Sequence, residues 1–476
     1  MNHRTLLFAL SLVMFSQQLL AQNLTFTRNF GGPRLDDARG LVSLPDGCLA
    51  FTGLTKSAED TLGTMYLTKT NAAGAELWSH RFDRQQEDGG NHLMAMRDGG
   101  FLITGHTALS YGKLCDGFLV RTDADGNELW RAIVGGADDD VCFASIELLD
   151  GSIVTVGRTE DAATHRFRVL FAKLDASGNQ VFMKQLGDDQ PCMAVQIQPS
   201  SDGNLFLAGF DYFSENTRDS RLMVMKCSLD GDILWKKTVE NLSGSWGNTL
   251  IPAPNGGCIA VGGIRSLEDS FEKACLVRFD IDGRILAQKT LPETDGRAYF
   301  FDGKGSAAGH FAATGITISA AGNERPVVVD FSENLEFVSK IELPLDGARP
   351  RCLEFCPDGT IALAGLQKTN STGLSDIFLA KTSGFDKNLA VLDVFNAEFL
   401  LFPNPFSEQA YLKIGHDFDQ KTLVIMAENG RIIRESQFSS PEFFIEKTGL
   451  PPGICLFLVK NSLGQTLKSG RLVISD

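Results

Sequence analysis

Residues 97–105 read RDGGFLITG, a tight polar turn followed by a short apolar run that ends in glycine. The same phrase occurs seven times along the chain. Its closing residues are Gly53, Gly105, Gly157, Gly209, Gly262, Gly315 and Gly365, in steps of 50 to 53 residues. Self-similarity at such a period is typical of solenoids, propellers and other repeat arrays.

A second phrase follows in each repeat: an apolar run, a turn, and an apolar residue beside a tryptophan. Tryptophan takes the last place at Trp78, Trp130 and Trp235, and we align Phe182, Ala287 and Phe337 with it in three further copies. Each repeat then holds four short runs separated by turns rich in Asp, Asn and Gly, which predicts a four-stranded antiparallel meander. Helical periodicity is absent between residues 23 and 388.

About seven copies of a four-stranded unit fit a β-propeller best, because a β-solenoid needs shorter coils and helical repeats need a 3.6-residue pattern. We therefore expect an all-β chain with a seven-bladed β-propeller over residues 22–388. The sequence resembles the loosely related bacterial propeller repeats that include the delta-60-like repeats, most closely at residues 118–130. That resemblance implies a fold and no shared activity.

Closure of the seventh blade has two candidates. Residues 24–30, LTFTRNF, match the fourth-strand phrase of the repeat, so the first strand of the chain is expected to complete the last blade and remove the exposed edges. The alternative is that residues 389–392, LAVL, supply the seventh blade's own fourth strand.

The first 21 residues predict a secretory signal peptide, with Arg4 ahead of an apolar run at residues 6–15 and Ala21 at the cleavage position. That run is too short to span a bilayer, and no other segment approaches the roughly 20 apolar residues that a spanning helix needs. We expect export and no transmembrane segment. The ten cysteines permit disulfides in an exported protein, but their scatter favours small buried side chains.

The repeat ends before residue 399, after an expected linker at 389–398. Residues 399–476 hold some seven short apolar runs, which predict a small Ig-like β-sandwich. This tail resembles the type A C-terminal sorting domain of the type IX secretion system of Bacteroidota. The stretches that carry the match are FPNPF at 402–406, NGRII at 429–433, LPPGI at 450–454 and GRLVI at 470–474.

The resemblance implies that the sorting-signal motif includes Pro403, Asn404, Pro405, Gly430, Gly453 and Gly470. It also implies passage through the periplasm, recognition by the type IX secretion machinery, and release or attachment at the outer-membrane surface. The alternative for this segment is an ordinary Ig-like accessory domain, since a fold alone does not fix a function.

The net charge of −15 argues against nucleic acid and anionic lipid as partners. Acidic residues precede most of the expected first strands. They are Asp36, Asp37, Asp88, Asp138, Asp139, Asp140, Asp188, Asp189, Asp295 and Asp346. First strands line the channel of a propeller, so these carboxylates are expected at one channel mouth, where calcium or a cationic ligand is the candidate occupant. The alternative is local, because Asp in a Gly-rich turn accepts backbone hydrogen bonds.

No sequence signature nominates an enzyme. The histidines lack zinc-ligand spacing, and neither a GxSxG elbow, a P-loop nor a Cys-His pair is present. We therefore expect a monomeric, exported binding module for an extracellular glycan or protein, with specificity in the longer loops between second and third strands. The alternatives are a polysaccharide hydrolase or lyase that uses the acidic channel mouth, and a structural surface-layer component.

Overall fold

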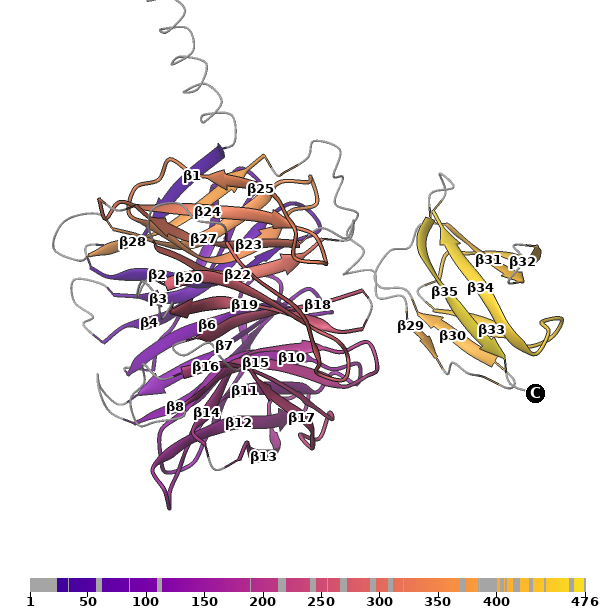
Figure 1. Ribbon diagram of the computed structural model, residues 1–476, viewed down its shortest axis with the longest axis horizontal. Coiled ribbons are helices and arrows are strands. Elements are labelled where there is room, and N and C mark those ends of the chain that lie inside the picture. The colour runs from indigo at the N-terminus through magenta and orange to yellow at the C-terminus, as the bar shows by residue number, and fades with distance from the viewer. Residues whose placement is uncertain are drawn as a thin grey trace, which may run out of the picture. The chain divides into compact units, whose positions relative to one another are not determined.

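The computed structural model describes most of the chain between residues 24 and 474 (Figure 1). The described ranges are 24–32, 34–56, 62–84, 86–108, 114–188, 190–212, 220–239, 245–254, 256–265, 272–291, 297–306, 311–319, 321–368, 374–383, 385, 400–402, 406, 409–413, 420–427, 431–440, 442–461 and 466–474. The chain divides into two compact units, Met1–Ala390 and Val391–Asp476. The expected signal peptide and the linker at 389–398 lie outside the described residues.

Six four-stranded antiparallel sheets of the first unit are built from consecutive strands. Sheet 1 contains β2 (Asp36–Ser43), β3 (Leu49–Thr55), β4 (Thr64–Thr70) and β5 (Glu76–Phe82). Sheet 2 contains β6 (Glu87–Ala95), β7 (Phe101–Ala108), β8 (Cys115–Thr122) and β9 (Glu128–Val134). Sheet 3 contains β10 (Asp140–Glu147), β11 (Ile153–Asp161), β12 (Arg166–Leu174) and β13 (Gln180–Leu186).

The pattern continues through the next three sheets. Sheet 4 contains β14 (Cys192–Pro199), β15 (Leu205–Tyr212), β16 (Ser220–Cys227) and β17 (Ile233–Thr238). Sheet 5 contains β18 (Trp246–Pro252), β19 (Cys258–Arg265), β20 (Glu272–Phe279) and β21 (Ile285–Thr290). Sheet 6 contains β22 (Arg297–Gly305), β23 (Phe311–Ile318), β24 (Glu324–Phe331) and β25 (Phe337–Glu342).

The seventh sheet joins the two ends of the unit. It contains β26 (Ala348–Phe355), β27 (Ile361–Lys368) and β28 (Ser375–Thr382), and its fourth strand is β1 (Leu24–Phe30). Strand β1 runs antiparallel to β28, with Thr27 opposite Ala380. The expectation that the first strand completes the last sheet is therefore confirmed, and residues 389–392, the alternative, lie outside the described residues.

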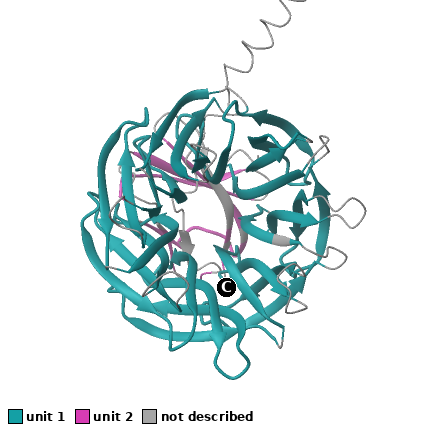
Figure 2. Ribbon diagram, turned by 90° about the vertical axis from the view of Figure 1, so that its left-hand side faces the viewer, with its two compact units in different colours: residues 1–390 teal, residues 391–476 magenta. Residues whose placement is uncertain are grey.

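The sheets form a ring around a central axis (Figure 2). Each first strand contacts the first strand of the next sheet, and β26 contacts β2 to close the circuit. Second and third strands are almost wholly buried, as in β3, because sheets cover both of their faces. The chain thus has an all-β, propeller-like fold, and no helix occurs among its described residues.

Aromatic side chains on outer strands tie neighbouring sheets together. Trp130 on β9 packs against Gly178 in the β12–β13 turn of the next sheet, and its indole Nε1 donates to the carbonyl of Ala176 at 3.2 Å. Trp78 lies opposite Lys69 on the neighbouring strand of its own sheet. In sheet 6 the register gives that place to Ser339, opposite Asp330, and so the alignment of Phe337 with tryptophan was wrong by two residues.

The second unit contains two antiparallel sheets around one core. The three-stranded sheet contains β29 (Leu400–Phe402), β30 (Gln409–Lys413) and β33 (Glu442–Glu446). The four-stranded sheet contains β31 (Lys421–Ala427), β32 (Ile432–Phe438), β34 (Gly453–Lys460) and β35 (Thr466–Ile474). Phe406, Phe457 and Leu472 lie in the shared core, and Cys455 is buried there with them.

Candidate functional site

Every first strand of the ring contains one β-bulge, and the bulge falls at the same place each time. In sheet 1, Ala38 pairs with Gly53 and Gly40 pairs with Thr52, which leaves Arg39 as the extra residue. A bulge re-aims the side chain that it displaces from the regular alternation of a strand. Here the displaced side chain is partly exposed between buried neighbours.

The equivalent extra residues of the seven sheets form one set, which we call the bulge ring. It consists of Arg39, Asn91, Phe143, Val195, Asn248, Phe301 and Arg351. Each member precedes the repeat glycine of its own sheet by 14 residues, as in the step from Arg39 to Gly53.

The repeat glycines explain why the bulges form where they do. A Cβ built on Gly53 would overlap the carbonyl oxygen of Asp37, and one on Gly157 would overlap that of Val141. Because the bulged strand brings its backbone this close to the second strand, only a residue without a side chain fits opposite it. The repeat glycine is thus required for the bulge, and the bulge in turn sets the direction of the extra side chain.

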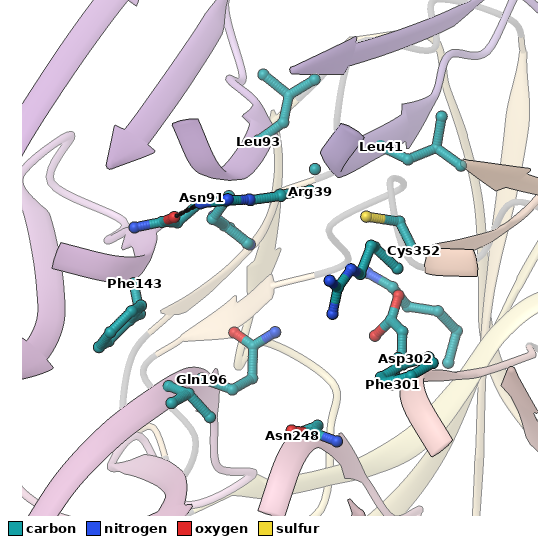
Figure 3. Close-up of a pocket in the computed structure, with 15 residues that line it drawn as sticks. Arg39, Leu41, Asn91, Leu93, Phe143, Gln196, Asn248, Phe301, Asp302 and Cys352 are labelled. Carbon is teal, nitrogen blue, oxygen red and sulfur yellow. Dashed lines mark hydrogen bonds between the residues drawn. The ribbon is translucent and has the colours of Figure 1, made fainter. Parts of the chain in front are cut away.

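The bulge ring surrounds a cavity of about 320 Å³ (Figure 3). This volume lies at the small end of the roughly 300–1,000 Å³ range of small-molecule sites. Every lining residue comes from a first strand. The lining comprises the seven members of the bulge ring together with Gly40, Leu41, His92, Leu93, Gln196, Asp302, Lys304 and Cys352.

Hydrogen bonds fix part of the bulge ring in position. Arg39 Nη1 donates to Asn91 Oδ1 at 3.2 Å, and Asn91 Nδ2 donates to the carbonyl of Cys142, beside the next bulge, at 3.0 Å. On another part of the circuit, Asn248 Nδ2 donates to the carbonyl of Phe300 at 2.6 Å. The side chains are therefore preorganised by neighbouring sheets instead of projecting freely.

Charge on the bulge ring is concentrated where sheets 7 and 1 meet. Arg39 Nε donates to Asp37 Oδ2 at 3.1 Å, and Arg351 Nε lies 3.8 Å from Asp37 Oδ1. The guanidinium carbon of Arg351 also lies 5.3 Å from the centre of the Phe301 ring, within the range of a cation–π contact. One carboxylate thus serves two guanidinium groups.

Titratable groups that line the cavity beside the bulge ring have pKa values shifted by burial. Desolvation, followed by the charge of Lys304, lowers the pKa of His92 to about 3, and its Nδ1 is buried without a hydrogen-bond partner. Desolvation raises the pKa of Asp302, whose two oxygens accept hydrogen bonds from the backbone N–H groups of Gly303 and Leu353. Lys304 Nζ pairs with Glu354 Oε1 at 2.7 Å.

Three of the predicted acidic residues share one structural position, at the start of a first strand. Asp36, Asp88 and Asp140 are buried, and each accepts a backbone N–H from the connection that leaves the preceding sheet. The donors are Gly32 at 2.7 Å, Arg84 at 2.9 Å and Gly136 at 2.6 Å. Burial raises the pKa of Asp88 and of Asp140. These contacts support the local, structural interpretation of the three carboxylates.

The other predicted acids are placed separately. Asp139 pairs with Arg158 at 2.6 Å, Asp188 with Lys236 at 3.0 Å, and Asp346 with Arg325 at 3.7 Å. Asp138 is half-buried in the turn before β10, whereas Asp189 and Asp295 lie outside the described residues. Of the predicted set, Asp37 alone contacts members of the bulge ring among the contacts the structure describes.

Metal-ligating side chains do not gather in the part of the chain that the structure describes: no three or more His, Cys, Asp or Glu residues there could hold one metal ion. The ten cysteines, all described, form no disulfide. Within the described ranges of the chain, no helix has the length and hydropathy needed to cross a membrane.

Only part of the predicted sorting motif can be located. Pro403, Asn404, Pro405 and Gly430 lie outside the described residues. Gly453 begins β34 with a φ of 110°, a value that favours glycine, and Gly470 on β35 pairs with Phe457 on β34.

No family model and no curated protein matches this chain. Among solved structures, the extracellular domain of a hybrid two component system from B. thetaiotaomicron is similar, with a TM-score of 0.45 and 12% identity over 95% of this chain and 60% of that one. The polysaccharide lyase Uly1 has a TM-score of 0.46 and 11% identity over 74% of this chain and 90% of its own. A PL25 ulvan lyase has a TM-score of 0.45 and 11% identity over 74% of this chain and 95% of its own. At these TM-scores and identities, the likeness decides neither the fold nor the activity of this chain.

Proposed function

We propose that this protein is an exported binding module: a seven-bladed β-propeller that takes its ligand on the bulge ring and is delivered by a C-terminal sorting domain of the type IX secretion system. The ligand is extracellular, a glycan or a protein segment that presents a small group to the cavity. The mature protein is released or held at the outer-membrane surface.

One observation carries the binding role. Seven bulges, each opposite a repeat glycine, bring seven side chains to one cavity, yet these side chains are chemically diverse: two Arg, two Asn, two Phe and one Val. A purely structural position would favour one residue type in every repeat, as the repeat glycine does. Repeated geometry with varied chemistry is what a recognition surface on a regular scaffold requires.

The delivery role is supported by the sequence of the tail, from FPNPF at 402–406 to GRLVI at 470–474. It is also supported by the separate core of the second unit, since a sorting domain must fold apart from its cargo. The lyase or hydrolase alternative relies on free carboxylates at the channel mouth. It has less support, because Asp36, Asp88 and Asp140 are buried and accept backbone hydrogen bonds.

Binding is tested with the full chain on arrays of extracellular glycans and surface proteins, followed by two ring variants, Phe143→Ala and Asn248→Ala. The matched control is Leu129→Ala, which alters an outer-strand side chain that is 57% exposed. We expect ligand capture to fall at least tenfold in the ring variants, the effect of losing about 1.4 kcal/mol, and to stay unchanged in the control. Capture that survives both ring variants in folded protein would refute the ring as the site, and turnover of a captured glycan would favour the enzyme alternative.

Delivery is tested by expressing the full chain, and a chain that stops at residue 390, in a host with a working type IX system and in the same host without it. We expect surface or culture-medium protein only for the full chain in the competent host. Periplasmic retention of the full chain there would contradict the sorting role while leaving the binding role intact.

A further inference from the structure

The two arginines of the bulge ring lie side by side at the seam where the ring closes. Arg351 comes from β26 of sheet 7 and Arg39 from β2 of sheet 1, and both flank Asp37 at 3.8 and 3.1 Å. Two guanidinium groups carry two positive charges, and the shared carboxylate cancels one of them. The seam therefore keeps an excess of one positive charge at the edge of the cavity.

Neighbouring charges do not remove this excess. The side chain of Asp36 accepts hydrogen bonds from the backbone N–H groups of Gly32 and Lys56, and adjacent residues of a strand point to opposite faces. Lys304 is neutralised by Glu354 at 2.7 Å. Asp302 is partly buried and lines the cavity, but both of its oxygens accept backbone N–H bonds that stabilise its charge, so the arginine pair remains the main positive charge of the cavity.

The arginine pair also keeps donors that no residue of the cavity uses. A guanidinium has five N–H groups, and the two described bonds of Arg39 use Nε and Nη1. Nε of Arg351 is buried and faces Asp37, and among the described residues no hydrogen bond is made by its two Nη groups. The side chains of Arg39 and Arg351 remain 34% and 37% exposed, and both line the cavity. Donors in this arrangement suit a planar anion, which guanidinium groups bind in bidentate fashion.

An apolar wall lies next to these donors. Phe301 supports the guanidinium of Arg351 and lines the same cavity, and Phe143 lines it from β10 (Figure 3). An aromatic face beside a fixed cation suits a ligand that has a flat or apolar surface next to its negative group. The cavity size restricts that ligand to a small molecule or to one terminal group of a larger one.

We propose that the bulge ring binds a small organic carboxylate, with the carboxylate on Arg39 and Arg351 and an apolar face against Phe301. This inference rests on the proposed binding function and gives the chemical class of the ligand. The whole chain carries a charge of −15, so its overall field repels such anions and the attraction must come from the seam itself. An acidic sugar unit and an aromatic acid both have this chemistry.

Isothermal titration calorimetry of the full chain distinguishes an acidic sugar from an aromatic acid as the ligand. One arm uses glucuronate and galacturonate with glucose as the neutral match, and the other uses benzoate with benzyl alcohol. We expect at least one acid to bind and its neutral match to bind at least about tenfold more weakly, the loss that accompanies one charge-assisted hydrogen bond. Added salt is expected to weaken the acid because the exposed part of the interaction is screened.

The decisive variant is Arg351→Gln, with Arg325→Gln as the matched control. Arg325 is an exposed arginine that pairs with Asp346 at 3.7 Å and is not among the residues that line the cavity. We expect Arg351→Gln to weaken the acid about tenfold or more while its melting temperature stays near that of the parent, and Arg325→Gln to bind as the parent does. Phe301→Leu is a second variant, expected to weaken binding without abolishing the preference for the acid.

Three results would overturn the carboxylate assignment: no binding of any acid by the folded chain, equal binding of an acid and its neutral match, or unchanged acid binding by Arg351→Gln. A neutral ligand whose capture depends on Phe143 and Asn248 would overturn this inference alone and leave the binding function standing. Ligand capture that no ring variant affects would overturn both.

Discussion

Gly157 faces the carbonyl oxygen of Val141 so closely that a side chain at position 157 would overlap that oxygen. The contact sits beside the bulge that turns Phe143 toward the cavity. The regularly spaced glycines of this chain therefore have a direct role at the candidate site, because each repeat glycine makes room for the bulge that turns one side chain toward the cavity.

Replacement of a repeat glycine is expected to destabilise the first unit. In Gly157→Ala the new methyl group must displace the backbone of Val141, and we expect a loss of about 1–3 kcal/mol in the free energy of unfolding. The matched control is Gly136→Ala, where a Cβ meets only the carboxylate of Asp140 at an ordinary 3.9 Å. Urea unfolding measures both, and equal stabilities of the two variants would contradict the steric argument.

Removal of the closing strand is expected to open the ring. Deletion of residues 24–30 leaves β28 as an unpaired edge and exposes the apolar cluster shared by sheets 7 and 1, against which Phe26 and Phe30 pack. We expect a sharply lower melting temperature and concentration-dependent association, measured by calorimetry and light scattering. Thr25→Ala, which changes the residue that the β1–β28 register skips, is expected to melt as the parent does. An unchanged melting temperature after the deletion would show that β1 does not hold the ring closed.

The buried carboxylates at the starts of first strands are expected to act without a metal. Asp140→Ala removes the acceptor of the Gly136 N–H, and we expect the free energy of unfolding to fall by about 1–3 kcal/mol. Urea unfolding is expected to give the same decrease in excess calcium and in chelator. Asp140→Asn keeps an acceptor and is expected to lose less. Thermal stabilisation of the parent by calcium that disappears in Asp140→Asn would instead show that these carboxylates hold a cation.

The neutral state of His92 predicts a pH dependence of stability. Its pKa of about 3 in the folded protein lies below the usual 6.5, so the unfolded chain binds the extra proton and stability falls as the pH falls from 6.5 toward 3. In His92→Gln this component is absent, and we expect the decrease in unfolding free energy between pH 6.5 and 5 to shrink by on the order of 2 kcal/mol. Urea unfolding of both proteins at pH 6.5 and 5 measures this difference. An equal decrease in unfolding free energy for the parent and His92→Gln would contradict the lowered pKa of His92.

Much of the fold is predictable because the repeats carry redundant local signals. Asp46 and Gly47 illustrate this: the carboxylate accepts the N–H of Cys48 while Gly47 adopts a φ of 80°, which is the turn that the Asp-Gly pair predicts. The four strands of each repeat follow from such turns and the apolar runs between them. The pairing of β1 with β28 followed from the likeness of residues 24–30 to the outer-strand phrase.

The candidate site was missed for a physical reason. A bulge depends on how the backbones of two paired strands approach each other, so the residue type alone does not distinguish Arg39 or Arg351 from an ordinary surface arginine. The signal was the constant step of 14 residues to the repeat glycine, which becomes meaningful only once the close approach at Gly53 is known. The acidic residues attracted attention instead because charge is visible in a sequence, whereas the backbone N–H groups that satisfy Asp36 and Asp140 are not.

The pairing of Thr27 with Ala380 joins residues 353 positions apart in the sequence. Until β28 has formed, β1 has no strand to pair with, and during that interval the strand of one molecule fits the open edge of another equally well. Two chains that exchange β1 would satisfy the same hydrogen bonds while remaining linked. The β1–β28 pairing that closes the ring is thus also the point at which newly synthesised copies at high concentration would exchange strands, and strand-swapped dimers are the misassembly that this architecture has to avoid.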